Sequence, residues 1–513
     1  MKLDRRTLIQ SAGSLVLAAG LAPRIGWAKS LGGYPFTLGV ASGDPWPDGF
    51  VIWTRLAPRP LDEHGGMPMV AVPVGYEIAE DENFRKIVRT GTDIARPELG
   101  HSVHVELSGL NPARRYWYRF SAGGEMSAVG TVRTAPVADA LADRVRIGVA
   151  GCQHYEAGLY TAYRHLSEER ELDAIFHYGD YIYEGSGNPG KKGRVRAHVG
   201  DEIYSIDDYR RRYALYKSDA DLQAAHAAAA FLVSYDDHEV DNNWAGEIDQ
   251  DGTPADAFLL RRAAAMQAWY ENLPVRRAQF PTNGRVRMFR RLDYGQLLRV
   301  HVLDTRQYRS DQLCDADATK NCRTPEDGAD ETMLGTEQET WLGNGLDNKA
   351  RWNLLAQQVM VMPMAYPASR KAGTLNADSW SGYPEARKRL VRQITERKLN
   401  NVVVATGDVH RHHAGNVPVD DAAPMGASVA AEFVTTSISS DGDGAATPAG
   451  WENMAATNPH CSLFDGRRGY QLFDITPKRW ETQVRVIDQV SRPGGAVSTV
   501  RRYTVEPGKA GIA

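Results

Sequence analysis

Over residues 34–134, short hydrophobic runs alternate with polar and turn residues. The apolar positions recur at the spacing of β-strands, and no segment of any length shows the helical period. The clearest runs are residues 50–54, 74–78 and 103–107. This pattern predicts a small all-β domain, built as a sandwich, over residues 34–135.

One run in this segment has the spacing of a known chain corner. Leu110 and Pro112 are followed by Tyr116 and Tyr118. The run resembles the corner of fibronectin-type domains, in which a tyrosine hydroxyl bonds back to the backbone of its own chain. It favours a fibronectin/Ig-like sandwich, and residues 137–143 are predicted to be a linker.

The pattern changes after residue 144. Compact apolar runs of strand length alternate with helix-like segments such as residues 160–170 and 263–272. Continuous apolar runs are typical of strands buried on both faces, so residues 144–486 are predicted to form a layered α/β domain. Residues 487–513 are expected to pack on or near it as a C-terminal tail. The strand-like runs are residues 145–150, 174–178, 230–234, 298–303 and 402–406.

Length and charge limit the possible classes of protein. A chain of 513 residues is too long for one typical core, which fits two or more domains. The net charge of −4 provides no basic field for nucleic acid, so no nucleic-acid partner is predicted. Beyond the N-terminus, no stretch is long and apolar enough to be predicted to span a bilayer.

Residues 1–28 have the pattern of an export signal. Arg5 and Arg6 precede an apolar run at residues 15–21, and a small-residue processing site ends at Ala28. The segment resembles a twin-arginine signal; an amphipathic or membrane-anchoring helix is the alternative. Because the run is shorter than the roughly 20 residues of a membrane span, we expect recognition by the twin-arginine machinery, with a periplasmic or secreted mature chain.

The four cysteines differ in their surroundings. Cys314 and Cys322 lie in a polar loop at a spacing that is not typical of zinc sites, so a local disulfide fits an oxidising compartment. Cys461 is expected to be a small buried apolar side chain. Cys152 directly follows a predicted strand and belongs with the polar clusters described next.

Polar clusters follow four of the apolar runs directly. An aspartate after a strand is often only a helix cap, but in α/β folds ligands collect beyond the carboxyl ends of the strands. The recurrence at four strand ends therefore favours one shared crevice. By contrast, the arginine-rich residues 194–196 and 210–212 are expected on solvated faces without a catalytic role. The four clusters are CQH at residues 152–154, GDYIYE at 179–184, DDHE at 236–239 and GDVH at 407–410.

The side chains in these clusters mix soft and hard metal ligands. Asp-rich surroundings suit hard cations, whereas a thiolate and a phenolate bind only when they are deprotonated, which a strongly Lewis-acidic ion achieves. This combination predicts a trivalent iron beside one or more divalent ions with oxygen ligands.

Three of these clusters and GVASGDP at residues 39–45 resemble the PhoD-like alkaline phosphatases, which belong to the calcineurin-like metallophosphoesterases. The resemblance extends from about residue 34 to 486 and also includes NPH at residues 458–460 and RGY at 468–470. It implies a metallophosphoesterase sandwich preceded by the small all-β domain. It also implies an exported enzyme that hydrolyses phosphate esters by attack of a metal-bound hydroxide.

Carried over motif by motif, the resemblance implies two kinds of metal ion. It implies Fe(3+) held by Cys152, Asp180, Tyr183 and His410. It implies Ca(2+) held by Asp180, Asp237 and Asp408, with the Asp180 carboxylate bridging both ions. A second calcium is expected, but no motif assigns its ligands; Asn242 and Asn243 are plausible neighbours.

His238 is the predicted catalytic residue, placed to contact the phosphate or to protonate the leaving oxygen. Its alternative role is to orient the carboxylate of Asp237. In the purple acid phosphatases, an asparagine precedes the catalytic histidine, whereas Asp237 takes that position here. Cys152 is interpreted as a ligand, so water is the attacking group.

Three other functions remain open from the sequence. A phosphodiesterase or phospholipase D-like enzyme could use the same metal cluster, because substrate choice depends on the rims of the site. A non-haem iron oxygenase or iron-binding protein typically needs two histidines and one carboxylate, and the extra carboxylates of Asp237 and Asp408 argue against it. A non-catalytic cell-surface β-domain protein would leave the acidic clusters unexplained.

Overall fold

Three β-sheets organise the part of the chain that the computed structural model describes, residues 31–188, 190, 193–312, 331–365 and 376–513. The predicted export signal and the Cys314–Cys322 pair lie outside these residues. None of the described helices is long and apolar enough to cross a membrane.

The largest sheet has nine strands in the order β21-β20-β19-β9-β10-β11-β1-β2-β5. Its central strands β9, β10, β11 and β1 run parallel, and the remaining pairs are antiparallel. Strands β9, β10 and β11 are fully buried, as their apolar sequences predict. The strands are β1 (Val40–Trp46), β2 (Gly49–Arg55), β5 (Ser102–Glu106), β9 (Val145–Ala150), β10 (Ala174–His177), β11 (Ala230–Val233), β19 (Gly469–Ile475), β20 (Trp480–Ile487) and β21 (Val497–Val505).

A seven-stranded sheet packs against it, in the order β12-β13-β14-β15-β17-β16-β18. Strand β15 shows why both faces of this sheet are apolar: Val403 and Ala405 contribute to the core between the two sheets, whereas Val402 and Val404 contribute to the core under the outer helices. The strands are β12 (Arg290–Tyr294), β13 (Leu298–Val302), β14 (Trp352–Ala356), β15 (Val402–Thr406), β16 (His412–Pro418), β17 (Ser428–Val434) and β18 (Cys461–Asp465).

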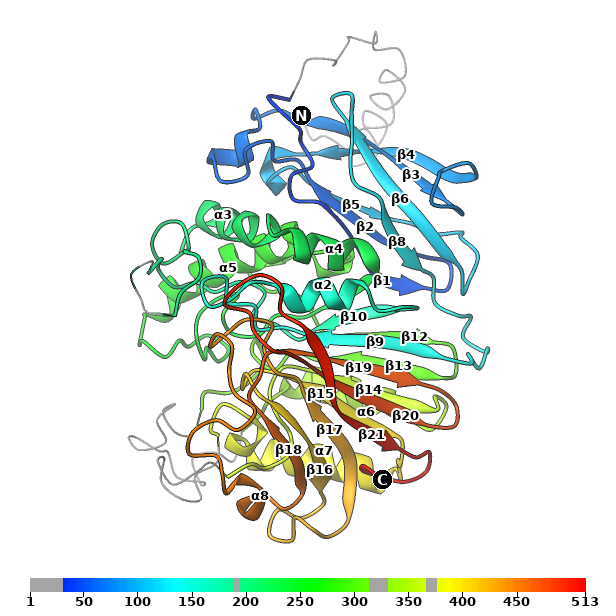
Figure 1. Ribbon diagram of the computed structural model, residues 1–513, viewed down its shortest axis with the longest axis vertical. Helices are drawn as coiled ribbons and strands as arrows, with labels where there is room; N and C mark the ends of the chain where they lie inside the picture. Colours follow the sequence, from blue (N-terminus) through cyan, green and yellow to red (C-terminus); the bar gives the residue numbers. More distant parts are fainter. Residues whose placement is uncertain (1–30, 189, 191–192, 313–330, 366–375) are drawn as a thin grey trace, which may run out of the picture.

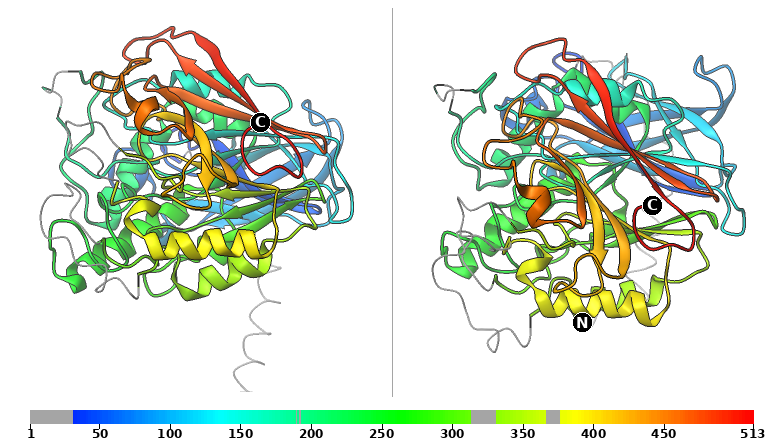
Figure 2. Two further views of the ribbon diagram at one scale, coloured as in Figure 1. Left: turned by 90° about the horizontal axis from the view of Figure 1, so that it is seen from below. Right: turned by 60° about the horizontal axis from the view of Figure 1, so that its bottom comes forward.

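Helices cover the two outer faces of this pair of sheets. Helices α6 and α7 lie along the outside of the seven-stranded sheet (Figure 2). On the nine-stranded sheet, a Cβ at Gly148 would lie 2.7 Å from a Leu166 methyl of α2, so glycine allows this helix to pack closely. The predicted layered α/β fold is therefore confirmed. The helices are α2 (Thr161–Ser167), α3 (Ile206–Lys217), α4 (Ala220–Ala228), α5 (Ala255–Asn272), α6 (Gly335–Gly345), α7 (Pro384–Glu396) and α8 (Met454–Thr457).

The N-terminal strands form the predicted small β domain, at the top of Figure 1. A five-stranded sheet of β3, β4, β6, β7 and β8 packs on β1, β2 and β5, and apolar side chains such as Phe50, Val74 and Tyr116 fill the space between the two layers. The backbone N–H of Asn111 donates to the hydroxyl of Tyr116 at 2.9 Å, which confirms the expected tyrosine corner. The strands are β3 (Val72–Ala79), β4 (Ile87–Ala95), β6 (Arg115–Ala122), β7 (Glu125–Met126) and β8 (Gly130–Arg133).

This β domain shares one of its layers with the rest of the protein. Strand β1 pairs in parallel with β11, so β1, β2 and β5 continue the nine-stranded sheet. Gly43 permits this junction, because a Cβ there would lie 2.0 Å from the carbonyl oxygen of Pro274. Asp44 then accepts two 2.8 Å bonds from Arg290 of β12. The GVASGDP motif therefore joins the N-terminal strands to both large sheets.

The C-terminal tail also becomes part of the main sheet. Strand β21 pairs antiparallel with β20 along its length, and Val505 is buried in the core. Residues 497–505 therefore form the outer strand of the nine-stranded sheet.

The prediction that the arginine-rich segments lie on solvated faces was wrong. Arg210 and Arg212 are buried, and Arg211 alone of the three is exposed. Arg210 pairs with Glu271 at 2.7 Å, whereas Arg212 donates to the carbonyl oxygens of residues 183, 185 and 201. Arg196 lies over two tyrosine rings and pairs with Asp219. These guanidinium groups satisfy buried carbonyls and carboxylates, a need that the local sequence does not reveal.

Candidate metal centre

The polar loops after β9, β10, β11 and β15 meet at one end of the two packed sheets. Within the described residues they form three overlapping groups. In each group, the possible ligand atoms lie within 4.8 Å of one another. Asp180 belongs to two of the groups, and Asp237 also belongs to two. The groups are Cys152, Asp180 and His410; Asp180, Asp237 and His238; and Asp236, Asp237 and Asp408.

The backbone at this meeting point is strained. Cys152, Asp180, Asp408 and His410 all have positive φ angles, of 50°, 54°, 67° and 54°. Such left-handed conformations cost about 1–3 kcal/mol each for non-glycine residues and cluster at functional sites. In this left-handed conformation, the backbone of each residue turns sharply at the end of its strand, which brings the side chain toward the shared centre.

Glycines let the loops approach closely enough for these side chains to meet. The ring of Tyr178 lies under two loops, because a Cβ at Gly151 or Gly407 would fall 2.4 Å or 2.0 Å from it. A Cβ at Gly179 would lie 2.4 Å from the backbone nitrogen of Asp236. The sequence order of glycine followed by a polar residue therefore has a packing reason after β9, β10 and β15.

One half of the centre, here called the mixed-ligand side, contains Cys152, Asp180, Tyr183 and His410. The Tyr183 hydroxyl donates to Asp180 Oδ2 at 2.8 Å and lies 3.2 Å from His410 Nε2. Burial raises the pKa of the Cys152 thiol and of the Tyr183 hydroxyl well above their usual values, and the carboxylate of Asp180 adds to both shifts. Both groups are therefore protonated until a cation displaces their protons.

Two residues that the sequence analysis did not identify hold this side in place. Ser440 Oγ lies 2.7 Å from the Tyr183 hydroxyl and donates to the carbonyl oxygen of Cys152. Asp441 Oδ2 lies 3.1 Å from His410 Nδ1, which leaves Nε2 of the ring facing Tyr183. A carboxylate behind a histidine fixes the tautomer and orientation of a metal-binding imidazole.

The other half, here called the carboxylate side, contains Asp236, Asp237 and Asp408. The fully buried guanidinium of Arg306 lies among them, hydrogen-bonded to Asp236 and 3.6 Å and 3.4 Å from Asp237 and Asp408. Burial alone would raise the pKa of Asp237, but Arg306 and His238 lower it below its ordinary value. For Asp408, burial and the neighbouring carboxylates raise the pKa.

The donor atoms of both sides fit metal ions. Asp180 Oδ1, Asp236 Oδ2 and Asp237 Oδ1 are buried and have no hydrogen-bond partner within the described residues. Buried carboxylate oxygens are costly unless they are paired or bind a cation. A cation shared by Asp180 and Asp237 would satisfy two of these three oxygens, and the third, Asp236 Oδ2, belongs to a group with Asp237 and Asp408.

His238 lies beside both sides and is held by Glu184. Its Nδ1 is 2.7 Å from Glu184 Oε2, and its ring stacks on that of Tyr183 with centroids 4.1 Å apart. Burial alone would lower the pKa of His238, but the carboxylates of Glu184, Asp237 and Asp180 raise it well above its usual value. These carboxylates therefore favour the protonated form of the His238 imidazole. Glu184 ends the GDYIYE motif, which was the available signal for its role.

Asn242 and Asn243 lie next to the centre through their backbones. The N–H of Asn243 donates to Asp237 Oδ2 at 2.8 Å, and the N–H of Asn242 donates to Glu184. Their side-chain amides both bond to Gln250, so the structure places neither amide on a candidate ligand.

Comparisons with known proteins fit this arrangement. The sequence profile of the PhoD-like phosphatases matches residues 147–484, and the profile of their N-terminal domain matches residues 20–136. The chain belongs to the PhoD-like phosphatase family. It is therefore a phosphoric ester hydrolase. It is 46% identical over 520 residues to alkaline phosphatase D of Bacillus subtilis (strain 168), an alignment that covers 99% of this chain and 88% of the relative.

Solved structures extend the likeness to three dimensions. A structure of PhoD superposes with a TM-score of 0.89 at 46% identity, covering 93% of this chain and 92% of that one. The purple acid phosphatase PPD1 from yellow lupin (Lupinus luteus) seeds matches with a TM-score of 0.54 at 14% identity, covering 92% and 74% of the two chains. At that identity the second match shows a common fold only.

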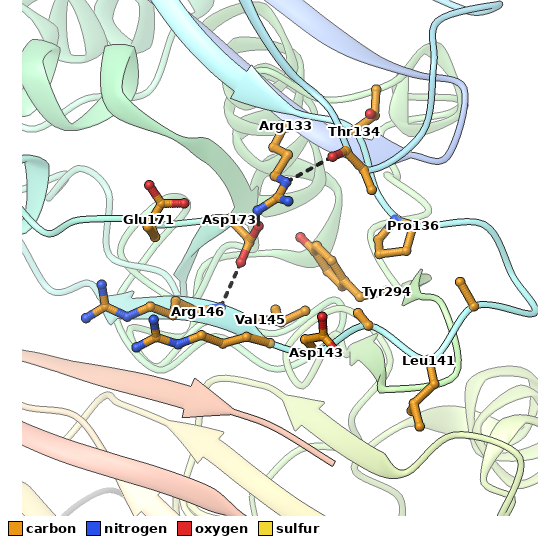
Figure 3. Close-up of a pocket in the computed structure, with 14 residues that line it drawn as sticks. Arg133, Thr134, Pro136, Leu141, Asp143, Val145, Arg146, Glu171, Asp173 and Tyr294 are labelled. Carbon is orange, nitrogen blue, oxygen red and sulfur yellow. Dashed lines mark hydrogen bonds and ion pairs between the residues drawn. The ribbon is translucent and has the colours of Figure 1, made fainter.

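The PhoD-like phosphatase also has a cavity of about 390 Å³ whose lining residues differ from those of the metal centre. It lies beside the linker between the N-terminal strands and β9, and its lining includes Arg133, Asp173 and Tyr294 (Figure 3). None of the candidate ligands lines it. Volume alone therefore does not locate the chemistry of this enzyme.

The expected packing of Cys461, and the histidines that follow the GDVH motif, can be checked in the same structure. Cys461 is buried in β18 and is a free cysteine among the residues that the structure describes, which confirms its expected role as a small buried side chain. His412 and His413, which follow the GDVH motif, belong to β16; the ring of His413 stacks on that of Trp451. The polar cluster after β15 therefore contributes Asp408 and His410 but neither of these two histidines.

Proposed function

We propose that this PhoD-like phosphatase is an exported, metal-dependent enzyme that hydrolyses phosphate esters at the centre formed by its four strand-end loops. The observation that carries the proposal is the sharing of Asp180 and Asp237 among three overlapping ligand groups. This arrangement suits two adjacent cations, and His238, whose pKa the surrounding carboxylates raise, lies beside it. The family match supports phosphate esters as the substrate class.

We assign iron(III) to the mixed-ligand side, held by Cys152, Asp180, Tyr183 and His410. Calcium is assigned to Asp180, Asp237 and Asp408, with Asp180 shared. The oxygens Asp180 Oδ1 and Asp237 Oδ1, which have no hydrogen-bond partner within the described residues, support a cation shared by these two carboxylates. When bound, the ions would supply Lewis acidity, which neutralises phosphate charge and makes a water molecule acidic enough to attack.

The chain's own residues supply the proton for the leaving group. Glu184 occupies Nδ1 of His238, so Nε2–H is the atom that donates to the leaving oxygen. The backbone N–H of Asn242 donates to Glu184 at 3.0 Å, and the Tyr183 ring stacks on the imidazole, so the donor cannot rotate freely. A fixed donor of this kind contributes through orientation as well as acidity.

The proposal is tested by metal analysis combined with a substrate comparison. Purified protein should contain iron and calcium, and it should hydrolyse p-nitrophenyl phosphate faster than bis-p-nitrophenyl phosphate or phosphatidylcholine. Absence of both metals from active protein would overturn the metal assignment. Faster cleavage of the diester or the lipid would instead support a phosphodiesterase or phospholipase D-like activity on the same centre.

Export is proposed from the sequence of residues 1–28, with a periplasmic or secreted mature enzyme. Replacing both arginines, Arg5→Lys with Arg6→Lys, should leave folded, uncleaved protein in the cytoplasm, because the twin-arginine machinery reads this pair. Cell fractionation and the mass of the mature chain provide the measurement. Normal export of the double variant would contradict the twin-arginine proposal.

A further inference from the structure

Beyond the ends of β10 and β11, the two strands lose their backbone ladder. Their last paired residues are His177 and Val233, and the N–H of Ser234 still donates to the carbonyl of His177. The following loops carry Asp180 and Asp237, and no backbone bond between residues 178–181 and 235–237 is found in the described structure. Another group must therefore fix the separation of these loops.

The Glu239 carboxylate occupies this gap. Its Oε1 accepts from the N–H of Tyr181 at 2.7 Å, and its Oε2 accepts from the N–H groups of Asp180 and Asp236 at 3.1 Å and 2.9 Å. One buried side chain thus gathers three backbone donors from two neighbouring loops. A carboxylate suits this position because it only accepts hydrogen bonds and has about four lone-pair sites.

The neighbouring gap is closed in a different way. Between the loops after β9 and β10, the N–H groups of Cys152 and Gln153 donate directly to the carbonyls of Gly179 and Asp180, at 3.0 Å and 3.1 Å. Backbone bonds therefore continue from β9 to β10, whereas Glu239 takes their place between β10 and β11. The loops after β10 and β11 also approach each other closely, since Gly179 has no room for a Cβ against Asp236.

We propose that Glu239 is a positioning residue that sets the distance between Asp180 and Asp237 and so prepares the chain for a cation shared by these two carboxylates. The inference rests on the metal-dependent function proposed above. Glu239 anchors Asp180 directly, by accepting the N–H of Asp180. It anchors Asp237 indirectly, by accepting the N–H of the preceding residue, Asp236. Glu239 belongs to none of the three ligand groups found within the described residues, so its role is to hold backbone and not to bind the ion itself.

The Glu239→Gln variant keeps the shape of the side chain but replaces one acceptor oxygen by an NH₂ group that faces backbone donors. Calcium chloride titrated into calcium-depleted protein should bind at least about 10-fold more weakly than in the wild type, which corresponds to about 1.4 kcal/mol. Isothermal titration calorimetry gives the affinity, and circular dichroism confirms that the protein is folded. Unchanged calcium affinity in folded Glu239→Gln would overturn the proposal.

Glu432→Gln is the matched control. Glu432 is also a fully buried carboxylate with three donors, the backbone N–H groups of Val361 and Met362 and the hydroxyl of Thr406, but it lies outside the gap between β10 and β11 and holds no backbone N–H of a candidate ligand. Its variant should lose thermal stability comparably while its calcium affinity stays within about twofold of the wild type. An equal loss of calcium affinity in both variants would overturn a specific role for Glu239.

The Glu239→Asp variant separates reach from charge. The shorter side chain keeps its negative charge and can still meet Asp236, three residues away, but it falls short of Asp180 and Tyr181 on the neighbouring loop. Calcium affinity should drop as in Glu239→Gln. Native affinity in Glu239→Asp would show that charge, not position, is what matters, and would overturn the proposal.

A measurement on the wild-type protein needs no variant. If Glu239 fixes the loops before a cation binds, the amide hydrogens of Asp180, Tyr181 and Asp236 should already be protected from hydrogen exchange in calcium-depleted protein. Rapid exchange of these amides would overturn the proposal. Failure of the wild type to bind calcium would instead contradict the calcium assignment, and hydrogen exchange alone would then decide the role of Glu239.

Discussion

The two sides of the metal centre lie within one crevice but differ in how their ligand atoms are compensated. On the mixed-ligand side, the Tyr183 hydroxyl connects Asp180, His410 and Ser440 through short contacts, and burial keeps the thiol and phenol protonated. On the carboxylate side, the buried Arg306 supplies a fixed positive charge among three aspartates.

This difference predicts different demands on a metal ion. A cation on the mixed-ligand side must displace protons from Cys152 and Tyr183, which requires a strong Lewis acid. On the carboxylate side, Arg306 and His238 lower the pKa of Asp237, so this carboxylate can bind a hard divalent ion without losing a proton, whereas burial and the neighbouring carboxylates raise the pKa of Asp408. One crevice can thus select two kinds of ion, and substitutions should separate them.

The largest effect is expected from Asp180→Asn, because Asp180 is the residue that both sides share. The variant should lose affinity for both ions, and turnover should fall at least about 1,000-fold, since phosphate charge is no longer neutralised. Metal content and the hydrolysis of p-nitrophenyl phosphate are the measurements. Asp173→Asn, a buried aspartate that accepts the backbone N–H of Arg146, is the control and should retain both metals.

His238→Ala should lower turnover by about 100- to 10,000-fold on esters with poor leaving groups, because the proton donor is lost, while both metals remain bound. Esters with good leaving groups should be affected less, because they need no proton. Glu184→Gln should have a smaller effect in the same direction, since the ring loses its anionic partner. Full turnover of His238→Ala on poor leaving groups would exclude the general-acid role.

Tyr183→Phe and Cys152→Ser should affect the mixed-ligand side alone. Phenolate and thiolate ligands on iron(III) absorb visible light, so the intact enzyme should be coloured, and each variant should change the band and bind iron less firmly. Calcium affinity should persist in both, although Asp180 is shared. Conversely, chelating calcium should reduce activity and leave most of the colour. An unaltered band in Tyr183→Phe would show that Tyr183 only packs beside the centre.

The strand-end residues could be found from the sequence because a polar cluster follows each apolar run. A glycine comes directly before Cys152, Asp180 and Asp408, whereas Asp237 follows its run without a glycine. Parallel strands bring their carboxyl ends together, so Cys152, Asp180 and Asp237 were expected at one edge. The N-terminal sandwich was also predictable from its alternation. That alternation does not show which strand edges pair, so the parallel pairing of β1 with β11 could be seen only in the structure.

The supporting residues were not predictable in the same way. Arg306 follows β13 and reaches Asp236 and Asp408 only because the two sheets pack face to face. Ser440 and Asp441 come from the segment after β17, far in sequence from the residues they hold. Arg212 was placed on the surface because its local run is polar, although its partners are backbone carbonyls, which a sequence does not display. Side chains that act through long-range partners have no local signature.

The smallest predicted effect tests whether Asp441 acts on the mixed-ligand side through His410. Its carboxylate lies 3.1 Å from His410 Nδ1, so its loss should free the ring to rotate and weaken the Nε2 ligand. Asp441→Ala should lower iron affinity by about 10- to 100-fold, and Asp441→Asn, which keeps an acceptor oxygen, should lower it less. Calcium affinity should be unchanged, because none of the carboxylate-side residues contacts Asp441 in the described structure.

Asp443→Asn is the matched control: this carboxylate, two residues along, holds the N–H groups of Val490 and Ser491 instead. Competition with an iron chelator gives the affinities. If Asp443→Asn weakened iron binding as much as Asp441→Ala, general loosening of the loop, rather than orientation of His410, would explain the loss.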